Sequence, residues 1–67
     1  MKKLSERIYD LRKEYNVSQK TVAQAIGATQ KAVDFWEKGI NEPKASYIVA
    51  LAIYFKVSTD YLLGLED

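Results

Sequence analysis

The sequence predicts a small all-α domain built from five short helices. Apolar residues recur at the 3.6-residue spacing of helices, and no stretch alternates apolar and polar residues as a half-buried strand would. Capping residues and glycines divide the chain into short segments. The length of 67 residues suits one core, so we expect residues 1–67 to form a single domain.

The first helix is predicted over residues 4–15. Its inward stripe at helical spacing is formed by Leu4, Ile8, Leu11 and Tyr15. The next residue, Asn16, tolerates the left-handed backbone conformation that ends many helices. We therefore expect the first helix to stop there.

Short polar residues and glycines delimit three further helices. The predicted ranges are residues 19–26, 30–38 and 59–63. The hydroxyl oxygens that can cap their first turns belong to Ser18, Thr29 and Ser58. Glycine adopts positive φ without steric cost, and the glycines that follow these helices are Gly27, Gly39 and Gly64.

A helix over residues 45–55, after Pro43, has less favourable ends. Lys44 is a poor cap, because it has no side-chain acceptor and its charge opposes the helix dipole. Lys56 occupies the exit position, where glycine would be easier to accommodate. We therefore predict this helix from its apolar residues and not from its ends.

The helix over residues 45–55 is apolar on more than one face. One core stripe consists of Ile48, Leu51, Ala52 and Phe55. The remaining apolar side chains, including Tyr47, are covered either by the last helix with Tyr61 or by a second copy of the chain. We favour a homodimer, with a contact made by Val49, Ile53, Tyr54, Leu62, Leu63 and Leu65.

The composition excludes several classes of function. The chain has no cysteine and no histidine, so it offers no disulfide, no thiolate or imidazole metal ligand and no nucleophile–base pair containing them. We expect no enzyme activity, metal, cofactor or small-molecule ligand. No apolar run reaches the roughly 18 residues of a membrane span, and no apolar region of a signal peptide follows residues 1–6. We therefore expect no signal peptide and a soluble cytoplasmic protein.

Basic residues are concentrated in the first part of the chain. Residues 1–38 carry eight basic and five acidic side chains, whereas residues 39–67 carry two basic and four acidic ones. The first part is therefore the better candidate for facing phosphates. The alternative is an ordinary solvated surface of mixed charge. The charge distribution alone does not distinguish this alternative from a surface that faces phosphates.

The spacing within residues 19–38 is typical of a helix-turn-helix, in which two helices cross closely through a turn of three or four residues. Ala23 is small enough for the crossing, and Gly27 suits the turn. The inward apolar positions are Val22, Ile26, Ala28, Val33 and Trp36. The outward positions on the second helix are then Gln30, Lys31, Asp34 and Phe35.

The chain resembles the Cro/phage-repressor-type helix-turn-helix (XRE) family. The resemblance is carried by Val17–Gly39, Ser5–Ile8, Leu11–Arg12, Glu42–Pro43, Leu51–Ala52 and Val57–Gly64. It implies a five-helix, lambda-repressor-like DNA-binding domain with the helix-turn-helix at the second and third helices. It also implies a transcriptional regulator that binds a near-palindromic operator in double-stranded DNA as a two-fold dimer.

The resemblance assigns roles to individual residues. It implies that Gln19 touches a phosphate and supports Gln30, and that Arg12 and Glu37 form a structural ion pair. The expected contacts with the DNA backbone are Gln19, Thr29, Lys38, Ile40, Asn41 and Lys44. The expected base-reading residues are Gln30, Lys31, Asp34 and Phe35. Glutamine can read adenine, and lysine favours guanine.

Two residues depart from the family pattern. Phe35 stands where a polar base-reading residue is usual, so it packs on a thymine methyl group or indicates a different ligand. Asp34 is repelled by phosphate, although a carboxylate can accept a hydrogen bond from cytosine N4. These departures, with the low net charge, leave a second hypothesis open. The chain could be a helical protein-interaction module, such as an antitoxin-like partner, with weak or no DNA binding.

Overall fold

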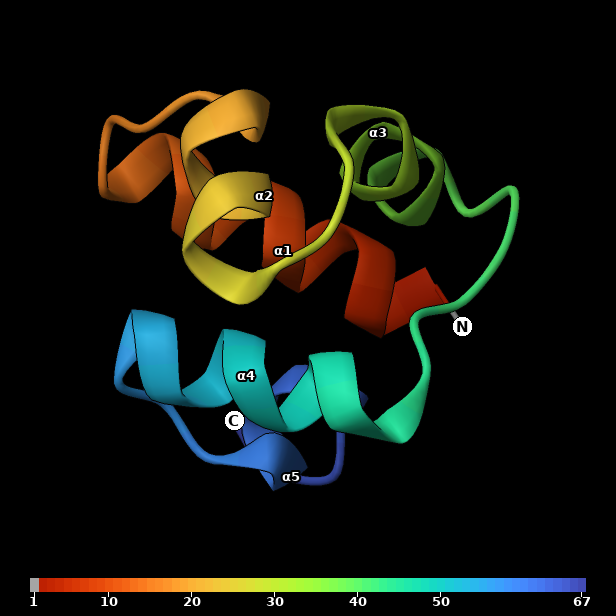
Figure 1. The fold of residues 1–67 in the computed structure, drawn as a ribbon. Coiled ribbons are helices and arrows are strands. Elements are labelled where there is room, and N and C mark those ends of the chain that lie inside the picture. The colour runs from red at the N-terminus through yellow and green to blue at the C-terminus, as the bar shows by residue number, and fades with distance from the viewer. Residues whose placement is uncertain (1) are drawn as a thin grey trace.

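The computed structural model describes residues 2–67, which contain five α-helices and no strand, as expected for an all-α domain. The helices are α1 (Lys2–Glu14), α2 (Gln19–Ile26), α3 (Gln30–Lys38), α4 (Ala45–Phe55) and α5 (Thr59–Leu63). In Figure 1, α2 and α3 lie at the top, α4 and α5 lie at the bottom, and α1 runs behind α2 toward the centre of the view. The upper and lower helices are in contact through α2 and α4, and α1 packs against α3 and α5. Among these described helices, none is long and apolar enough to cross a membrane.

The predicted ends of the last four helices are confirmed, whereas α1 spans Lys2–Glu14 instead of residues 4–15. The side chains of Ser18, Thr29 and Ser58 each accept a hydrogen bond from the backbone N–H of the third residue of the helix that follows, at 2.9–3.1 Å. Asn16 ends α1 with a φ of 56°. Lys44 makes no side-chain capping bond, so α4 begins without this support. Packing must therefore stabilise α4 more than its ends do.

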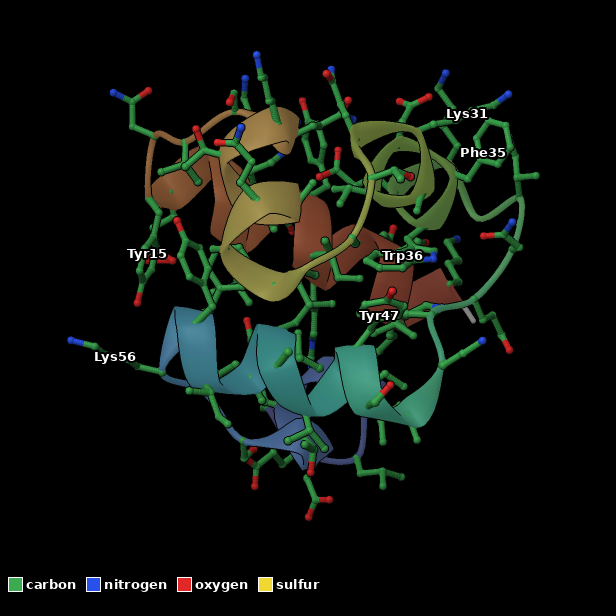
Figure 2. The ribbon with its side chains drawn as sticks, in the orientation of Figure 1. Tyr15, Lys31, Phe35, Trp36, Tyr47 and Lys56 are labelled. Carbon is green, nitrogen blue, oxygen red and sulfur yellow. The ribbon has the colours of Figure 1, made fainter. Side chains whose placement is uncertain are left out.

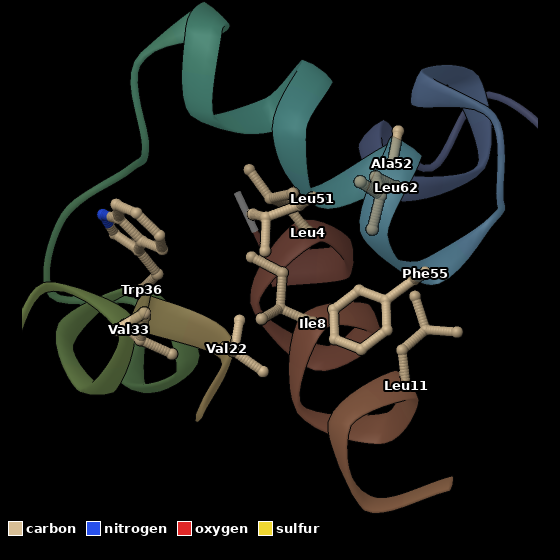
Figure 3. Packing of buried hydrophobic residues seen from close by; sticks show 11 residues of the cluster. Leu4, Ile8, Leu11, Val22, Val33, Trp36, Leu51, Ala52, Phe55 and Leu62 are labelled. Atoms are coloured by element: carbon tan, nitrogen blue, oxygen red, sulfur yellow. The ribbon is translucent and has the colours of Figure 1, made fainter. Parts of the chain in front are cut away.

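All five helices contribute to one core (Figure 3). Its buried members are Leu4, Ile8, Leu11, Val22, Ala23, Val33, Trp36, Leu51, Ala52, Phe55 and Leu62. Two residues lie differently from the prediction. Leu62 is completely buried, so its assignment to a dimer surface is wrong: α5 turns this side chain inward. Tyr15 lies at the edge of the core, where its ring packs against Phe55 and its hydroxyl donates to the Phe55 carbonyl at 2.7 Å.

Arg7 holds the end of the chain against α1, a role that the sequence analysis missed. Its Nη1 donates hydrogen bonds to the carbonyls of Tyr61 and Glu66, and its guanidinium lies 4.1 Å from the centre of the Tyr61 ring. The hydroxyl of Ser58 bonds to the Glu66 carboxylate. These contacts fix the segment after α5, which carries the exposed side chain of Leu65.

Lys56 has a φ of 58°, in the left-handed region that is unfavourable for a side chain with a Cβ atom. Its side chain points into solvent (Figure 2), so a glycine at this position loses no packing. We expect Lys56→Gly to raise the free energy of unfolding by about 1 kcal/mol, measured by urea denaturation. Lys56→Ala is the matched control, since it removes the same charge but keeps Cβ. An equal gain in both variants would show that charge, not backbone conformation, is responsible.

Candidate nucleic-acid interface

The helices α2 and α3 are joined by a turn of three residues, Gly27 to Thr29. Gly27 has a φ of 77°, which a residue with a side chain adopts only at a cost. The N–H of Ala28 then returns to the carbonyl of Ala23 at 2.9 Å, and Thr29 caps α3. Ala23 is buried where the two helices meet. These residues give the compact crossing expected of a helix-turn-helix.

The first turn of α3 presents polar side chains to solvent. Gln30 and Lys31 are both exposed, and neither is needed for the core. Phe35, one turn further on, is half-buried, and the Lys31 ammonium lies 5.5 Å from the centre of its ring. Figure 2 shows Lys31 and Phe35 together on the outer side of α3, while Trp36 faces Tyr47. The ring of Phe35 therefore restricts the Lys31 side chain through a cation–π contact.

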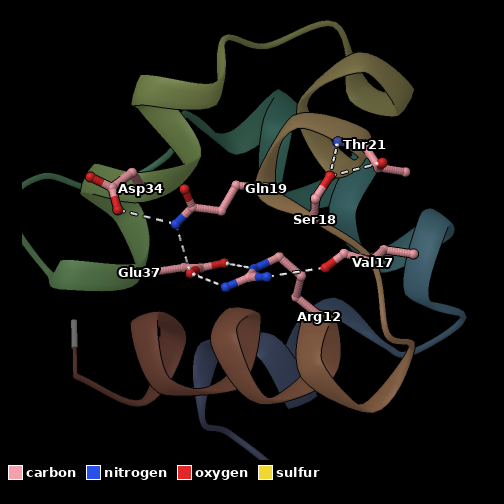
Figure 4. A network of polar contacts seen from close by, with 7 residues as sticks. All are labelled: Arg12, Val17, Ser18, Gln19, Thr21, Asp34 and Glu37. Carbon is pink, nitrogen blue, oxygen red and sulfur yellow. Dashed lines mark hydrogen bonds and ion pairs between the residues drawn. The ribbon is translucent and has the colours of Figure 1, made fainter.

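An ion pair between Arg12 and Glu37 joins α1 to α3 (Figure 4). The guanidinium binds the carboxylate through two parallel hydrogen bonds, Nε to Oε2 at 2.6 Å and Nη2 to Oε1 at 3.0 Å. A third bond runs from Arg12 to the Val17 carbonyl at 3.0 Å. The Glu37 side chain is only 4% exposed, and its hydrogen bond raises the pKa of Arg12. The pair thus fixes the orientation of α3 on α1.

Gln19 extends this network between α2 and α3. Its Nε2 donates to Asp34 Oδ1 and to Glu37 Oε1, each at 3.1 Å (Figure 4). The Gln19 amide group therefore supports the middle and end of α3, rather than Gln30 at its start. This arrangement holds the N-terminus of α2 close to α3 and leaves the Gln30 side chain exposed.

Asp34 also binds Lys38, one turn further along α3. The distance from Lys38 Nζ to Asp34 Oδ2 is 2.9 Å, so both oxygens of this carboxylate have partners within the chain. Hydrogen bonds from Lys38 and then Gln19 lower the pKa of Asp34, which is ionised near neutral pH. The spacing of four residues typical of helical ion pairs could have revealed the contact with Lys38 from the sequence.

The loop after α3 is exposed at Ile40, Asn41 and Lys44. The N–H of Ile40 donates to the carbonyl of Phe35 at 3.0 Å and completes the end of α3. The N–H of Ile40 is therefore already occupied within the chain, and the part of this residue that faces outward is its side chain, 60% exposed. The hydroxyl oxygen of Thr29 is likewise already occupied, because it accepts the hydrogen bond that caps α3.

The chain is similar in sequence to known transcriptional regulators. The chain is 32% identical over 62 residues to the uncharacterized HTH-type transcriptional regulator YobD of Bacillus subtilis (strain 168). It is 32% identical over 60 residues to the repressor protein C2 of Salmonella phage P22. The alignments cover 92% and 90% of this chain, but 55% and 28% of the relatives, so it spans only part of their length.

Solved structures of the P22 c2 repressor have the same fold. A crystal structure in complex with the synthetic operator 9T superimposes with a TM-score of 0.85 and 30% identity, over 88% of this chain and 89% of that one. The solution structure of the repressor's DNA-binding domain superimposes with a TM-score of 0.84 and 32% identity, over 90% of this chain and 79% of that one. Residues 8–62 match the family described as helix-turn-helix. The chain belongs to the helix-turn-helix family of the phage-repressor type.

Proposed function

We propose that this chain is a cytoplasmic transcriptional regulator, a repressor, that binds double-stranded DNA sequence-specifically as a homodimer. The observation that carries the proposal is the α2–α3 unit, which exposes Gln30 and Lys31 at the start of a firmly anchored helix. The similarity to a repressor solved with its operator supports it. The activity consists of binding, and we assign no catalytic role.

In the proposed complex, the first turn of α3 enters the major groove. Gln30 pairs with adenine through N6 and N7, and Lys31 donates to guanine O6 and N7. Phe35 contacts a thymine methyl group. The backbone contacts are made by the N-terminus of α2 near Gln19, by the start of α3 at Thr29, and by Lys38, Ile40, Asn41 and Lys44. The polar side chains on the outer face of α3 do not contribute to the core, and contact with DNA would give them a function.

The proposed dimer contact lies on α4 and the segment after α5. Ile53 and Leu65 are 72% and 74% exposed, and Val49 is 49% exposed. Tyr54 and Leu63 are half-buried and can contribute their outer edges. Two recognition helices would then read half-sites about 34 Å apart.

We expect Ile53→Asp to abolish cooperative binding to a two-half-site duplex, because it places like charges across the two-fold axis. Binding to a single half-site should stay within about twofold, since an exposed substitution rarely disturbs the fold. Gel-shift titrations with both duplexes measure the two effects. Ala25→Asp is the matched control, because Ala25 is exposed on α2 and receives the same charge. Equal losses in both variants, or an unchanged Ile53→Asp protein, would contradict the assigned contact.

Selection from a random duplex pool at stated salt tests the function itself. We expect enrichment of a near-palindromic site. The competing function is a protein-interaction module, in which the outer face of α3 with Asp34 and Phe35 would contact a protein partner instead of DNA. A pool that shows no enrichment, together with binding of a protein partner through α3, would overturn the proposal in favour of that module.

A further inference from the structure

The pairing of Asp34 with Lys38 has a consequence for DNA binding. Lys38 is the only basic side chain within α3 besides Lys31, and it lies at the end that leads into the exposed loop. Its ammonium is 2.9 Å from a carboxylate, although its side chain is 61% exposed and could reach a phosphate. A phosphate that binds Lys38 must therefore compete with Asp34.

The position of the Asp34 carboxylate, which would compete with a phosphate for Lys38, is fixed by neighbouring side chains. Its second oxygen accepts a hydrogen bond from Gln19, whose amide is in turn bonded to the nearly buried Glu37. The carboxylate is thus fixed by α2 and cannot simply rotate away when DNA approaches. With both oxygens occupied, Asp34 is also poorly placed to accept a hydrogen bond from a cytosine.

We propose that Asp34 is a positioning residue that restrains Lys38 and lowers the affinity of this surface for DNA of any sequence. The inference rests on the proposed function. Non-specific binding depends almost entirely on the neutralisation of DNA phosphates by basic side chains. Restraining Lys38 therefore weakens this phosphate contribution to affinity and leaves the contacts of Gln30 and Lys31 with bases unchanged. The result is a surface that binds random DNA weakly and relies on base contacts for affinity.

The test compares Asp34→Asn with the wild-type chain on a random-sequence duplex and on a selected operator. Asparagine keeps an oxygen that can accept from Gln19 but removes the charge that binds Lys38. We expect about two- to fivefold tighter binding to both duplexes at low salt. The log–log salt dependence should become steeper by up to about 0.9, the value for one additional phosphate contact.

Two controls separate this effect from general electrostatics. Asp10→Asn makes the same change of charge at an exposed position on α1 and should leave the salt dependence unaltered. In a Lys38→Ala background, Asp34→Asn should produce no steepening, because the restrained ammonium is absent. Steepening that persists in this background would show direct repulsion of phosphate and would overturn the proposal.

Three further outcomes of the binding measurements each have a different meaning. A wild-type chain that binds DNA while Asp34→Asn binds with the same affinity and salt slope contradicts this inference alone. A change in the preferred base, with no change on random DNA, shows that Asp34 reads a base instead. A wild-type chain that binds neither duplex contradicts the proposed function and this inference with it.

Discussion

Replacing Arg12 with alanine is expected to lower the free energy of unfolding by about 3–5 kcal/mol, because the Glu37 carboxylate stays buried without its partner. A core of this size rarely supplies more than about 3–5 kcal/mol, so the variant should be largely unfolded. Urea denaturation followed by the fluorescence of Trp36, the single tryptophan, measures the effect. A loss below about 1 kcal/mol would mean that the pair is energetically like an exposed surface contact.

A double variant distinguishes the unpaired charge from loss of packing. In Arg12→Met with Glu37→Met, both charges are gone and side chains of similar length fill the space. Such replacements of buried ion pairs are often neutral or stabilising, so most of the stability should return. If the double variant is as unstable as Arg12→Ala, the hydrogen bond from Arg12 to the Val17 carbonyl, which both variants lack, accounts for the loss instead of the unpaired charge.

Removing the side chains of Gln30 and Lys31 together is expected to abolish preferential binding to the selected operator. Each good bidentate contact with a base contributes about 1–3 kcal/mol of discrimination, so the double alanine variant should lose about 100-fold or more in affinity. Binding to random DNA should fall only several-fold, through the lost charge of Lys31. Fluorescence anisotropy with both duplexes measures the difference.

The stability of the same variant serves as its internal control. Both side chains are exposed and neither contributes to the core, so the free energy of unfolding should change by less than about 0.5 kcal/mol. Gln24→Ala, at an exposed position on α2, should leave operator affinity unaltered. A stable Gln30–Lys31 variant that still prefers the operator would place base recognition outside the first turn of α3.

Local chemistry explains why the helices could be predicted so closely from the sequence. A hydroxyl cap such as Ser18 and a left-handed exit such as Gly27 act within a few residues, so the sequence carries their signal directly. The Arg12–Glu37 pair, implied by the family resemblance, is also present in the structure. By contrast, Leu62 and Leu65 look alike in sequence, yet one is fully buried and the other 74% exposed. Only the packing of α5 decides between them.

Contacts between distant segments explain what the sequence did not reveal. Arg7 reaches the Tyr61 and Glu66 carbonyls across more than fifty residues, and no local pattern indicates such a contact. The two partners of Gln19 likewise depend on the crossing of α2 and α3. The sequence therefore indicates the exposed face of α3 and, through the family resemblance, the Arg12–Glu37 pair, but not the contacts of Gln19 that complete the network. That network engages Asp34 and Lys38 and leaves the side chains of Gln30 and Lys31 exposed.

Substitution of 7-deazapurines in the selected operator tests most directly whether α3 reads bases in the major groove. The modification removes the N7 acceptor of adenine or guanine and leaves base pairing intact. We expect two clusters of sensitive purines about one helical turn apart, each costing about tenfold in affinity, and no sensitivity in the Gln30→Ala, Lys31→Ala variant. Binding that is indifferent to 7-deazapurines at every position would contradict major-groove recognition by α3.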